Sequence, residues 1–362
     1  MKRERIFYLD FVRAVATISI IFTHYNALFI YNTSIPMPQK AILTMTVGNV
    51  YIGSWGVSLF LIISGAALMY VYENELDVLK FWKKRFINIY PMFWIAYIFA
   101  MLFNFYRIGS IDTSIGKWRY IFSILGIDGY IANWGVQTFF LVGEWFLGYI
   151  IIIYIIGRLK NWKEEYLPPL IITAVAIIIY IIFPILRKGV NEYPLLLAII
   201  TAVLYILSIV LGAKDVSLFV KLPEFLFGMY FIKFIKKPNL KMALISLVIV
   251  VINTLVKPDF ISVVQCTYVG IASFVCLAYV SELLQFDIIQ KICKVICKYS
   301  YPCFIVHHFI IYRMVEKFNL DNITMGQNYL LFACCIVVIA VFSYLLLHVN
   351  DKVVQLLKKE AK

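Results

Sequence analysis

The sequence predicts an all-α fold, a polytopic bundle of transmembrane helices, from three observations. Of its 362 residues, 63% are hydrophobic and 15% are charged, whereas soluble domains are about 45–50% apolar and about 25% charged. The apolar residues form unbroken stretches that reach the length of about 20 residues needed for a membrane-spanning helix. The basic residues gather between these stretches. Together with a mean hydropathy of +0.88, this pattern excludes a soluble enzyme, a disordered chain, a nucleic-acid-binding domain and a β-barrel, whose strands are short and alternating.

Eleven apolar stretches are candidate spans. In chain order they are Ile6–Ile30, Val50–Tyr72, Ile89–Tyr106, Thr138–Ile156, Pro168–Leu186, Tyr193–Leu211, Leu222–Ile235, Met242–Val256, Ile261–Leu284, Tyr299–Val315 and Tyr329–Val349. The first follows a basic N-terminus as in a signal peptide, but it is too long, contains charged residues and has no A-x-A cleavage site, so we expect a retained helix.

The distribution of Lys and Arg reduces these eleven stretches to ten spans. An odd number would place the N-terminus and the basic C-terminus on opposite sides, against the excess of basic residues in cytoplasmic loops. Interpreting Tyr193–Leu211 as a re-entrant or interfacial hairpin removes the conflict and puts both termini in the cytoplasm. The net charge of +13 is then a property of cytoplasmic loops. We predict one membrane domain over residues 1–350, a basic cytoplasmic tail over 351–362 and no appended soluble domain.

The first stretch carries the densest set of ionisable residues, Asp10, Arg13 and His24. Such residues inside a span cost about 2.5–3.5 kcal/mol each on insertion scales, so they mark candidate sites. Asp10 and Arg13 are expected to pair on one face of the helix. Arg13 and His24 are close to three whole turns apart and share a stripe about 16 Å long. The simpler alternative is a topology anchor at Asp10 and Arg13 with His24 as a buried polar group.

A basic cluster, Lys83, Lys84 and Arg85, precedes the third stretch. These side chains are suited to the phosphates of a cytosolic cofactor, Arg through its bidentate fork and Lys as a point charge. An ordinary positive flank with interfacial aromatic anchors is the alternative. Second-rank candidates are Ser64, Glu144, Tyr301 and His307. We expect no metal, because Cys293, Cys297, Cys303 and His307 match no zinc spacing.

Together these segments resemble the acyltransferase-3 family of bacterial multi-pass membrane acyltransferases. Tyr8-Leu-Asp10, Arg13-Ala14 and His24 are similar to the family's Y-L-D-x-x-R-A opening and Arg-x10-His motif. The other matching segments are Phe60-Leu-Ile-Ile-Ser-Gly65, Phe81-Trp-Lys-Lys-Arg85, Ile89-Tyr-Pro91, Glu144-Trp-Phe-Leu147, Leu222-Pro-Glu-Phe-Leu-Phe-Gly228, and Tyr299-Ser-Tyr301 with His307. The resemblance covers almost the whole chain, and its usual ten core helices agree with the span count.

The resemblance implies transfer of an acetyl or other short acyl group, such as succinyl, from cytosolic acyl-CoA to a sugar hydroxyl. The acceptor would be a cell-surface or exported polysaccharide or a lipid-linked sugar, and the protein would reside in the bacterial cytoplasmic membrane. His24 would act as general base, and Arg13 would position the donor or stabilise the oxyanion. Asp10 would orient Arg13, and Arg85, Lys84 and Lys83 would hold the CoA phosphates. Acyl-CoA would be a co-substrate, with no permanently bound cofactor.

Three departures from the family pattern are visible. Asn88 stands at the second position of the family's Arg-x-x-Arg, and Phe304 stands where Tyr is frequent. As the third departure, we expect no counterpart of the family's optional extracytoplasmic hydrolase-like domain. Direct transfer is favoured over an acyl-enzyme, because no Ser or Cys lies beside a base in the sequence. A glycan or acyl-carrier transporter is the alternative function, since intramembrane charges also suit transport. A scaffold within a synthase complex would leave Arg13 and His24 without a role.

Overall fold

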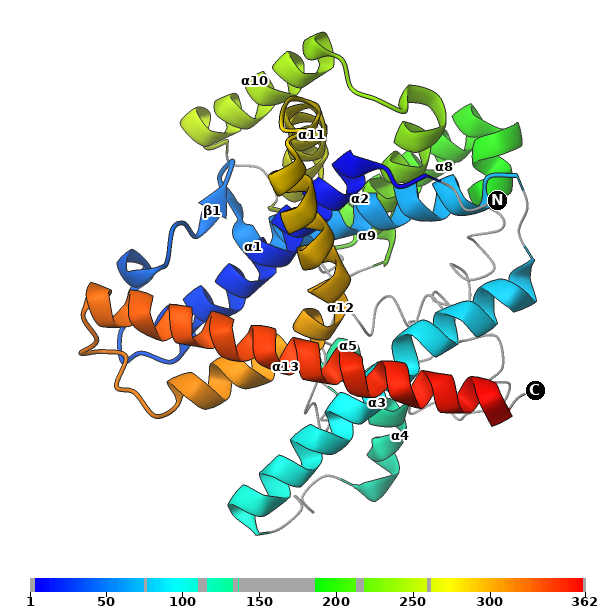
Figure 1. Ribbon diagram of the computed structural model, residues 1–362. Coiled ribbons are helices and arrows are strands. Elements are labelled where there is room, and N and C mark those ends of the chain that lie inside the picture. The colour runs from blue at the N-terminus through cyan, green and yellow to red at the C-terminus, as the bar shows by residue number, and fades with distance from the viewer. Residues whose placement is uncertain are drawn as a thin grey trace. The chain divides into compact units, whose positions relative to one another are not determined.

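The computed structural model describes residues 4–74, 77–109, 116–132, 136, 186–212, 218–258 and 262–360. These residues are mainly helical, with one hairpin of two short strands (Figure 1), which confirms the all-α fold. The chain forms two compact units. Unit 1 contains Met1–Leu76, Ile185–Ser300 and Leu320–Asn328, and unit 2 contains Asp77–Pro184, Tyr301–Asn319 and Tyr329–Lys362.

Unit 1 is a helical bundle built around α2 (Ile52–Tyr72), which packs against α1, α9 and α11. In addition, α8 packs against α9, and α10 packs against α11. The other elements are α1 (Phe7–Tyr31), η1 (Pro38–Lys40), β1 (Thr46–Val47), β2 (Val50–Tyr51), α8 (Pro194–Val210), α9 (Leu218–Tyr230), the π-helix η4 (Phe231–Ile235), α10 (Leu240–Val256), α11 (Ser262–Leu283) and the first part of α12 (Asp287–Val315).

Two glycines allow α2 and α9 to approach closely. A Cβ atom added at Gly65 would collide with the backbone carbonyl of Phe225, and one added at Gly228 would collide with that of Ile62. Small residues at helix contacts let backbones approach, which is how helices associate in a membrane without a hydrophobic driving force between them. Gly65 and Gly228 therefore mark a close contact between α2 and α9.

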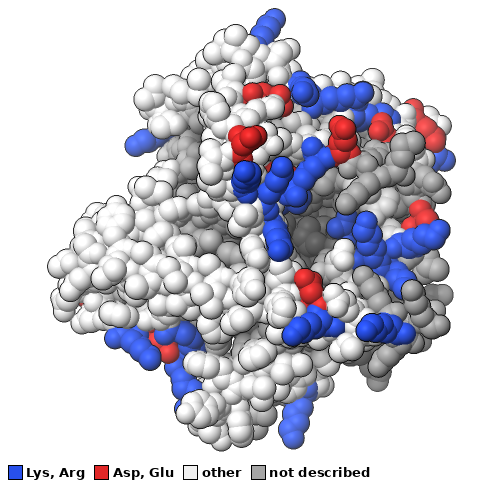
Figure 2. Space-filling view, viewed as in Figure 1, with Lys and Arg blue, Asp and Glu red and all other residues white. Residues whose placement is uncertain are grey.

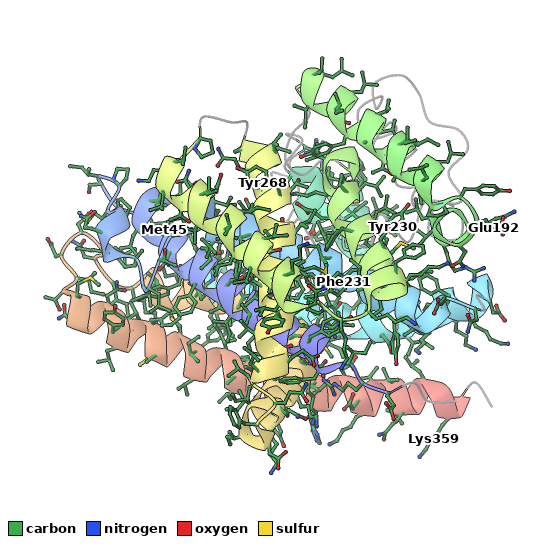
Figure 3. All side chains as sticks on the ribbon, turned by 90° about the horizontal axis from the view of Figure 1, so that it is seen from above. Met45, Glu192, Tyr230, Phe231, Tyr268 and Lys359 are labelled. Atoms are coloured by element: carbon green, nitrogen blue, oxygen red, sulfur yellow. The ribbon has the colours of Figure 1, made fainter. Side chains whose placement is uncertain are left out.

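Aromatic packing and side-chain hydrogen bonds complete unit 1. Phe231 is the first residue of η4, with its ring 5.0 Å from that of Phe274 and 5.9 Å from that of Tyr8. The neighbouring Tyr230 donates a 2.6 Å hydrogen bond to the carbonyl of Pro194, which joins α9 to α8. Tyr268 likewise joins α11 to α10 (Figure 3) through its hydrogen bond to Asn253.

Unit 2 contains α3 (Val78–Ile108), η2 (Lys117–Arg119), α4 (Tyr120–Ile124), α5 (Asp128–Ala132), the last part of α12, and all but the first turn of α13 (Met325–Glu360). The N-cap of α3 is Asp77, whose side chain accepts a hydrogen bond from the amide of Lys80, and the helix ends at Gly109 in the left-handed conformation that favours glycine. Tyr90 and Trp94 donate hydrogen bonds to the carbonyls of Leu125 and Ile124, which fixes α4 against α3.

Five described helices have the length and apolar composition to cross a membrane. They lie over Phe7–Tyr31, Ile52–Tyr72, Lys83–Ile108, Ser262–Leu283 and Met325–Leu357, and two shorter apolar helices are α8 and α10. Acidic and basic side chains gather in patches, with wide areas that carry neither (Figure 2), as expected of a surface that contacts lipid. The number of ten spans and the cytoplasmic termini stay predictions, and Thr138–Ile156 and most of Pro168–Leu186 lie outside the described residues.

The predicted hairpin shape of Tyr193–Leu211 is wrong, because this segment forms one uninterrupted helix, α8, while its interfacial placement stays a prediction. Its only proline, Pro194, stands in the first turn, where a proline removes no helical hydrogen bond. No glycine occurs between residues 194 and 210, so nothing in this segment favours a reversal. Two other boundaries also differ: α12 begins at Asp287, ahead of the predicted span, and α13 continues to Glu360 through the predicted tail.

Candidate functional site

The polar face of α1 is the centre of the candidate site. The helix is continuous from Phe7 to Tyr31, so Arg13 and His24 project within about 20° of each other and about 16 Å apart along the axis. Both side chains are half-buried. Between them Thr17, which is buried, donates a 2.8 Å hydrogen bond to the carbonyl of Arg13. The predicted stripe therefore exists as one face of a single helix.

The expected Asp10–Arg13 pair is not formed. The buried carboxylate of Asp10 pairs with the guanidinium of Arg5, which comes from the segment before α1. Asp10 also accepts a 3.2 Å hydrogen bond from the thiol of Cys297 at its backbone carbonyl. Arg5 competes successfully because it reaches Asp10 from outside the helix, whereas Arg13 is fixed on the helix one turn away. Among the described residues Arg13 has no ion-pair partner.

A second polar face of α1 is structural. Ser19 and Thr23 donate hydrogen bonds to carbonyls of their own helix, at 2.8 Å each. They lie where α2 comes closest: a Cβ atom added at Gly56 would meet Ser19, and one added at Gly53 would meet Thr23. These polar groups are already satisfied and serve packing, so they are not part of the candidate site.

The basic cluster lies in unit 2, within the second turn of α3. Lys83 and Lys84 are exposed, while Arg85 is half-buried, with its guanidinium 5.4 Å from the centre of the Phe81 ring. The buried Nε atom of Arg85 has no hydrogen-bond partner among the described residues. Asn88 follows one turn later and is exposed. A helix that carries Arg85 and Lys84 in adjacent positions offers a fork and a point charge to a phosphate group.

The second-rank candidates are distributed over both units and the part of the chain outside the described residues. Ser64 lies on α2 in unit 1 and donates to the carbonyl of Phe60. In unit 2, Tyr301 donates to the carbonyl of Ile89 on α3 at 2.9 Å. The buried His307 places Nδ1 2.9 Å from the carbonyl oxygen of Phe304, so Nδ1 carries the proton and a neutral ring has Nε2 as its acceptor. Glu144 lies outside the described residues.

A buried polar cluster in unit 1 was not predicted. Glu224 on α9 is 0% exposed and Lys221 is 2% exposed, and their charged groups lie 3.4 Å apart. Oε1 of Glu224 also accepts hydrogen bonds from Ser58 on α2, at 2.8 Å, and from Thr267 on α11, at 3.4 Å. Oε2 has no partner among the described residues. The cluster links three helices through one carboxylate oxygen.

This cluster extends to a thiol and a phenol. The Sγ atom of Cys266 lies 3.1 Å from Oγ of Ser58 and 3.5 Å from Nζ of Lys221. Tyr205 on α8 donates to Thr267 at 3.1 Å. The signal that could have revealed this cluster is the pair Lys221 and Glu224, at the start of the apolar stretch Leu222–Ile235. Ionisable residues are rare inside a span and mark candidate sites.

A smaller polar group lies beside α5 in unit 2. The buried Asp128 accepts hydrogen bonds at Oδ2 from Ser123, at 3.2 Å, and from Tyr97, at 3.3 Å. Burial raises the pKa of Asp128 from its ordinary 3.8 to about 6, against the opposing effect of hydrogen bonds from Gly129, Ser123 and Tyr97. Asp128 lies in the connection after α3 and is held against that helix by the hydrogen bond from Tyr97.

No group of three or more His, Cys, Asp or Glu side chains suited to a metal occurs within the described ranges. The comparison with known families then identifies the chain. The family model of acyltransferase-3, described as an acyltransferase domain, matches residues 6–349, nearly the whole sequence. No curated protein and no solved structure is significantly similar. The chain therefore belongs to the acyltransferase-3 family and is a membrane acyltransferase.

Proposed function

We propose that the protein transfers an acetyl or other short acyl group from acyl-CoA to a sugar hydroxyl of a cell-surface or exported polysaccharide or a lipid-linked sugar. One observation carries the proposal: α1 is a single helix that presents Arg13 and His24 on one face, away from the face that packs against α2. Family membership favours this reaction over transport. The bacterial cytoplasmic membrane is the proposed location.

His24 is the proposed general base. A hydroxyl attacks a thioester carbonyl once its proton is withdrawn, and a histidine has a pKa near operating pH. In the proposed step His24 accepts the hydroxyl proton while the new C–O bond forms. The tetrahedral intermediate then collapses, the C–S bond breaks, and the His24 imidazolium returns the proton to the CoA thiolate. The products are the acyl ester and the CoA thiol. The proton taken from the hydroxyl ends on the thiol, and no acyl-enzyme is needed.

The geometry of α1 limits the role of Arg13. Its Cα lies about 16 Å along the helix from that of His24, which is further than an arginine side chain reaches. We therefore propose that stabilising an oxyanion beside His24 is not its main role. Of the two roles considered for Arg13, positioning the extended donor is the one that this separation supports. Asp10 holds Arg5 instead, so its proposed part is to anchor the start of α1.

The basic turn of α3 is the proposed site for the CoA phosphates. Arg85 offers a guanidinium whose Nε has no partner among the described residues, and Lys84 and Lys83 add exposed ammonium groups. An arginine donates in a fork that matches phosphate oxygens, while lysine acts as a point charge. Asn88 contributes hydrogen bonds but no charge, so Arg85 is the main phosphate contact in this proposal.

The test uses purified full-length protein with acetyl-CoA and an acceptor glycan extract. We expect His24→Ala to abolish transfer while the protein still inserts and folds. His308→Ala is the matched control, because His308 is exposed and has no assigned role. Wild-type transfer by His24→Ala would refute the base assignment. In cells, NMR of the surface polysaccharide from a deletion strain and its parent would identify the acyl group and the sugar hydroxyl.

A further inference from the structure

Unit 2 contains an apolar cavity of about 300 Å³ between α3, α12 and α13. Its lining includes Ala96 and Ala100 from α3, Ile310 from α12, and Leu345 and Leu346 from α13. This volume is at the lower end of the range for small-molecule pockets, about 300–1,000 Å³. It suits one hydrocarbon chain and not a whole two-chain lipid. Because α3 and α13 are candidate membrane spans, the bilayer around them supplies lipid hydrocarbon chains.

Arg313 is the one charged side chain in the lining formed by the described residues. Its Nη1 donates to Glu316 and its Nη2 donates to Asn104, both at 2.9 Å. The buried Nε has no acceptor within the described part of the chain. A guanidinium carries five N–H donors, so these two bonds leave donors for another oxygen.

The local charges do not cancel around Arg313. Glu316 is shared by two guanidinium groups, since Arg107 also donates to it at 2.7 Å. Two positive charges and one negative charge leave one net positive charge at this end of the cavity. The guanidinium of Arg313 lies 5.4 Å from the centre of the Phe309 ring, which holds it against the apolar wall. An occupant that matches both features has a hydrocarbon tail and an anionic head.

We propose that the cavity binds an anionic phospholipid, with one acyl chain among α3, α12 and α13 and the phosphate at Arg313. The apolar lining matches the chain, and the excess positive charge matches the head. A guanidinium donates to a phosphate in a bidentate geometry. In a zwitterionic lipid, the ammonium of the head group would compete with Arg313 for that phosphate. This site is separate from the proposed acyl transfer and does not depend on it.

The experiment measures lipid binding to the full-length protein. Delipidated protein in detergent is titrated with phosphatidylglycerol or with phosphatidylcholine of the same acyl chains, and bound lipid is counted by native mass spectrometry. We expect phosphatidylglycerol to bind about tenfold more tightly, the scale of one charge-assisted hydrogen bond. Equal binding of the two lipids would overturn the proposal, and so would stronger retention of a polyprenyl phosphate than of phosphatidylglycerol.

Variants separate the head from the tail. Arg313→Gln should reduce the preference for phosphatidylglycerol to less than about twofold, and Arg313→Lys should retain part of it. Arg119→Gln removes a positive charge elsewhere in unit 2 and should leave the preference intact. If Arg313→Gln kept the full preference, or if Arg119→Gln abolished it, the proposed phosphate contact would be wrong.

Filling the cavity tests the position of the chain. Leu345→Trp enlarges a lining side chain that is 49% exposed, so the fold has room for it. It should lower the affinity for both lipids about tenfold. Val337→Trp is the control on the same helix, 63% exposed and outside the lining, and should not change binding. Equal effects of the two tryptophans, or none from Leu345→Trp, would place the acyl chain elsewhere.

Discussion

The buried ion pair of Lys221 and Glu224 gives a stringent test of the structure. Lys221→Met removes the ammonium and leaves a carboxylate that is 0% exposed with hydroxyl donors only. Breaking one side of a buried pair costs about 3–5 kcal/mol, because the remaining charge is uncompensated. Glu224→Gln should cost a similar amount, since it strands the ammonium. The double variant removes both charges, and we expect it to be more stable than either single variant.

The assay is reversible unfolding in mixed micelles of increasing SDS content, followed by far-UV circular dichroism. The control is Lys188→Met, which breaks a pair of the same residue types with Glu192. Those side chains lie 3.8 Å apart but are 67% and 49% exposed, and exposed pairs contribute about 0–1 kcal/mol. Equal losses from Lys221→Met and Lys188→Met would refute the buried pair. A double variant as unstable as the sum of the two singles would refute the coupling.

Three further predictions concern packing, pH and donor binding. Gly65→Ala should destabilise the protein by about 1–3 kcal/mol through overpacking against α9, measured in the same unfolding assay, whereas Gly326→Ala, in open space on α13, should not. Asp128 holds its proton in the folded state up to about pH 6, so stability should fall by about 3 kcal/mol as pH rises from about 4 through 6; Asp128→Asn should abolish that slope. Arg85→Gln should raise KM for acyl-CoA about tenfold with little change in kcat, and an equal rise in Arg119→Gln would contradict a specific phosphate contact.

The sequence predicted the all-helical fold and several of the described helices because its apolar stretches are long and their ends are marked. The stretch Ile6–Ile30 became α1, shifted by one residue at each end, and its helical period correctly placed Arg13 and His24 on one face. Periodicity fixes which residues share a face of one helix. Periodicity does not determine which of several neighbours forms an ion pair with a charged side chain, and Asp10 pairs with Arg5.

Contacts between segments far apart in the chain could not be predicted from the sequence. Glu224 meets Ser58 and Thr267 across 166 and 43 positions of the chain, and no local pattern encodes such a meeting. The hairpin at Tyr193–Leu211 failed for a different reason. It was inferred from the side of the membrane on which the basic residues would lie, which constrains only the number of membrane crossings. The backbone of α8 follows the local sequence, which contains no residue that favours a reversal.

The length of α13 has a consequence for how the C-terminus is displayed. Its candidate span covers 33 residues, Met325–Leu357, and rises about 50 Å, whereas the hydrocarbon core is about 30 Å thick. Keeping this part wholly in lipid would need a tilt of about 53°, beyond the usual range of about 0–40°. Part of the helix therefore extends beyond the hydrocarbon core, and a fluorophore on Lys359 would report the tilt of the helix.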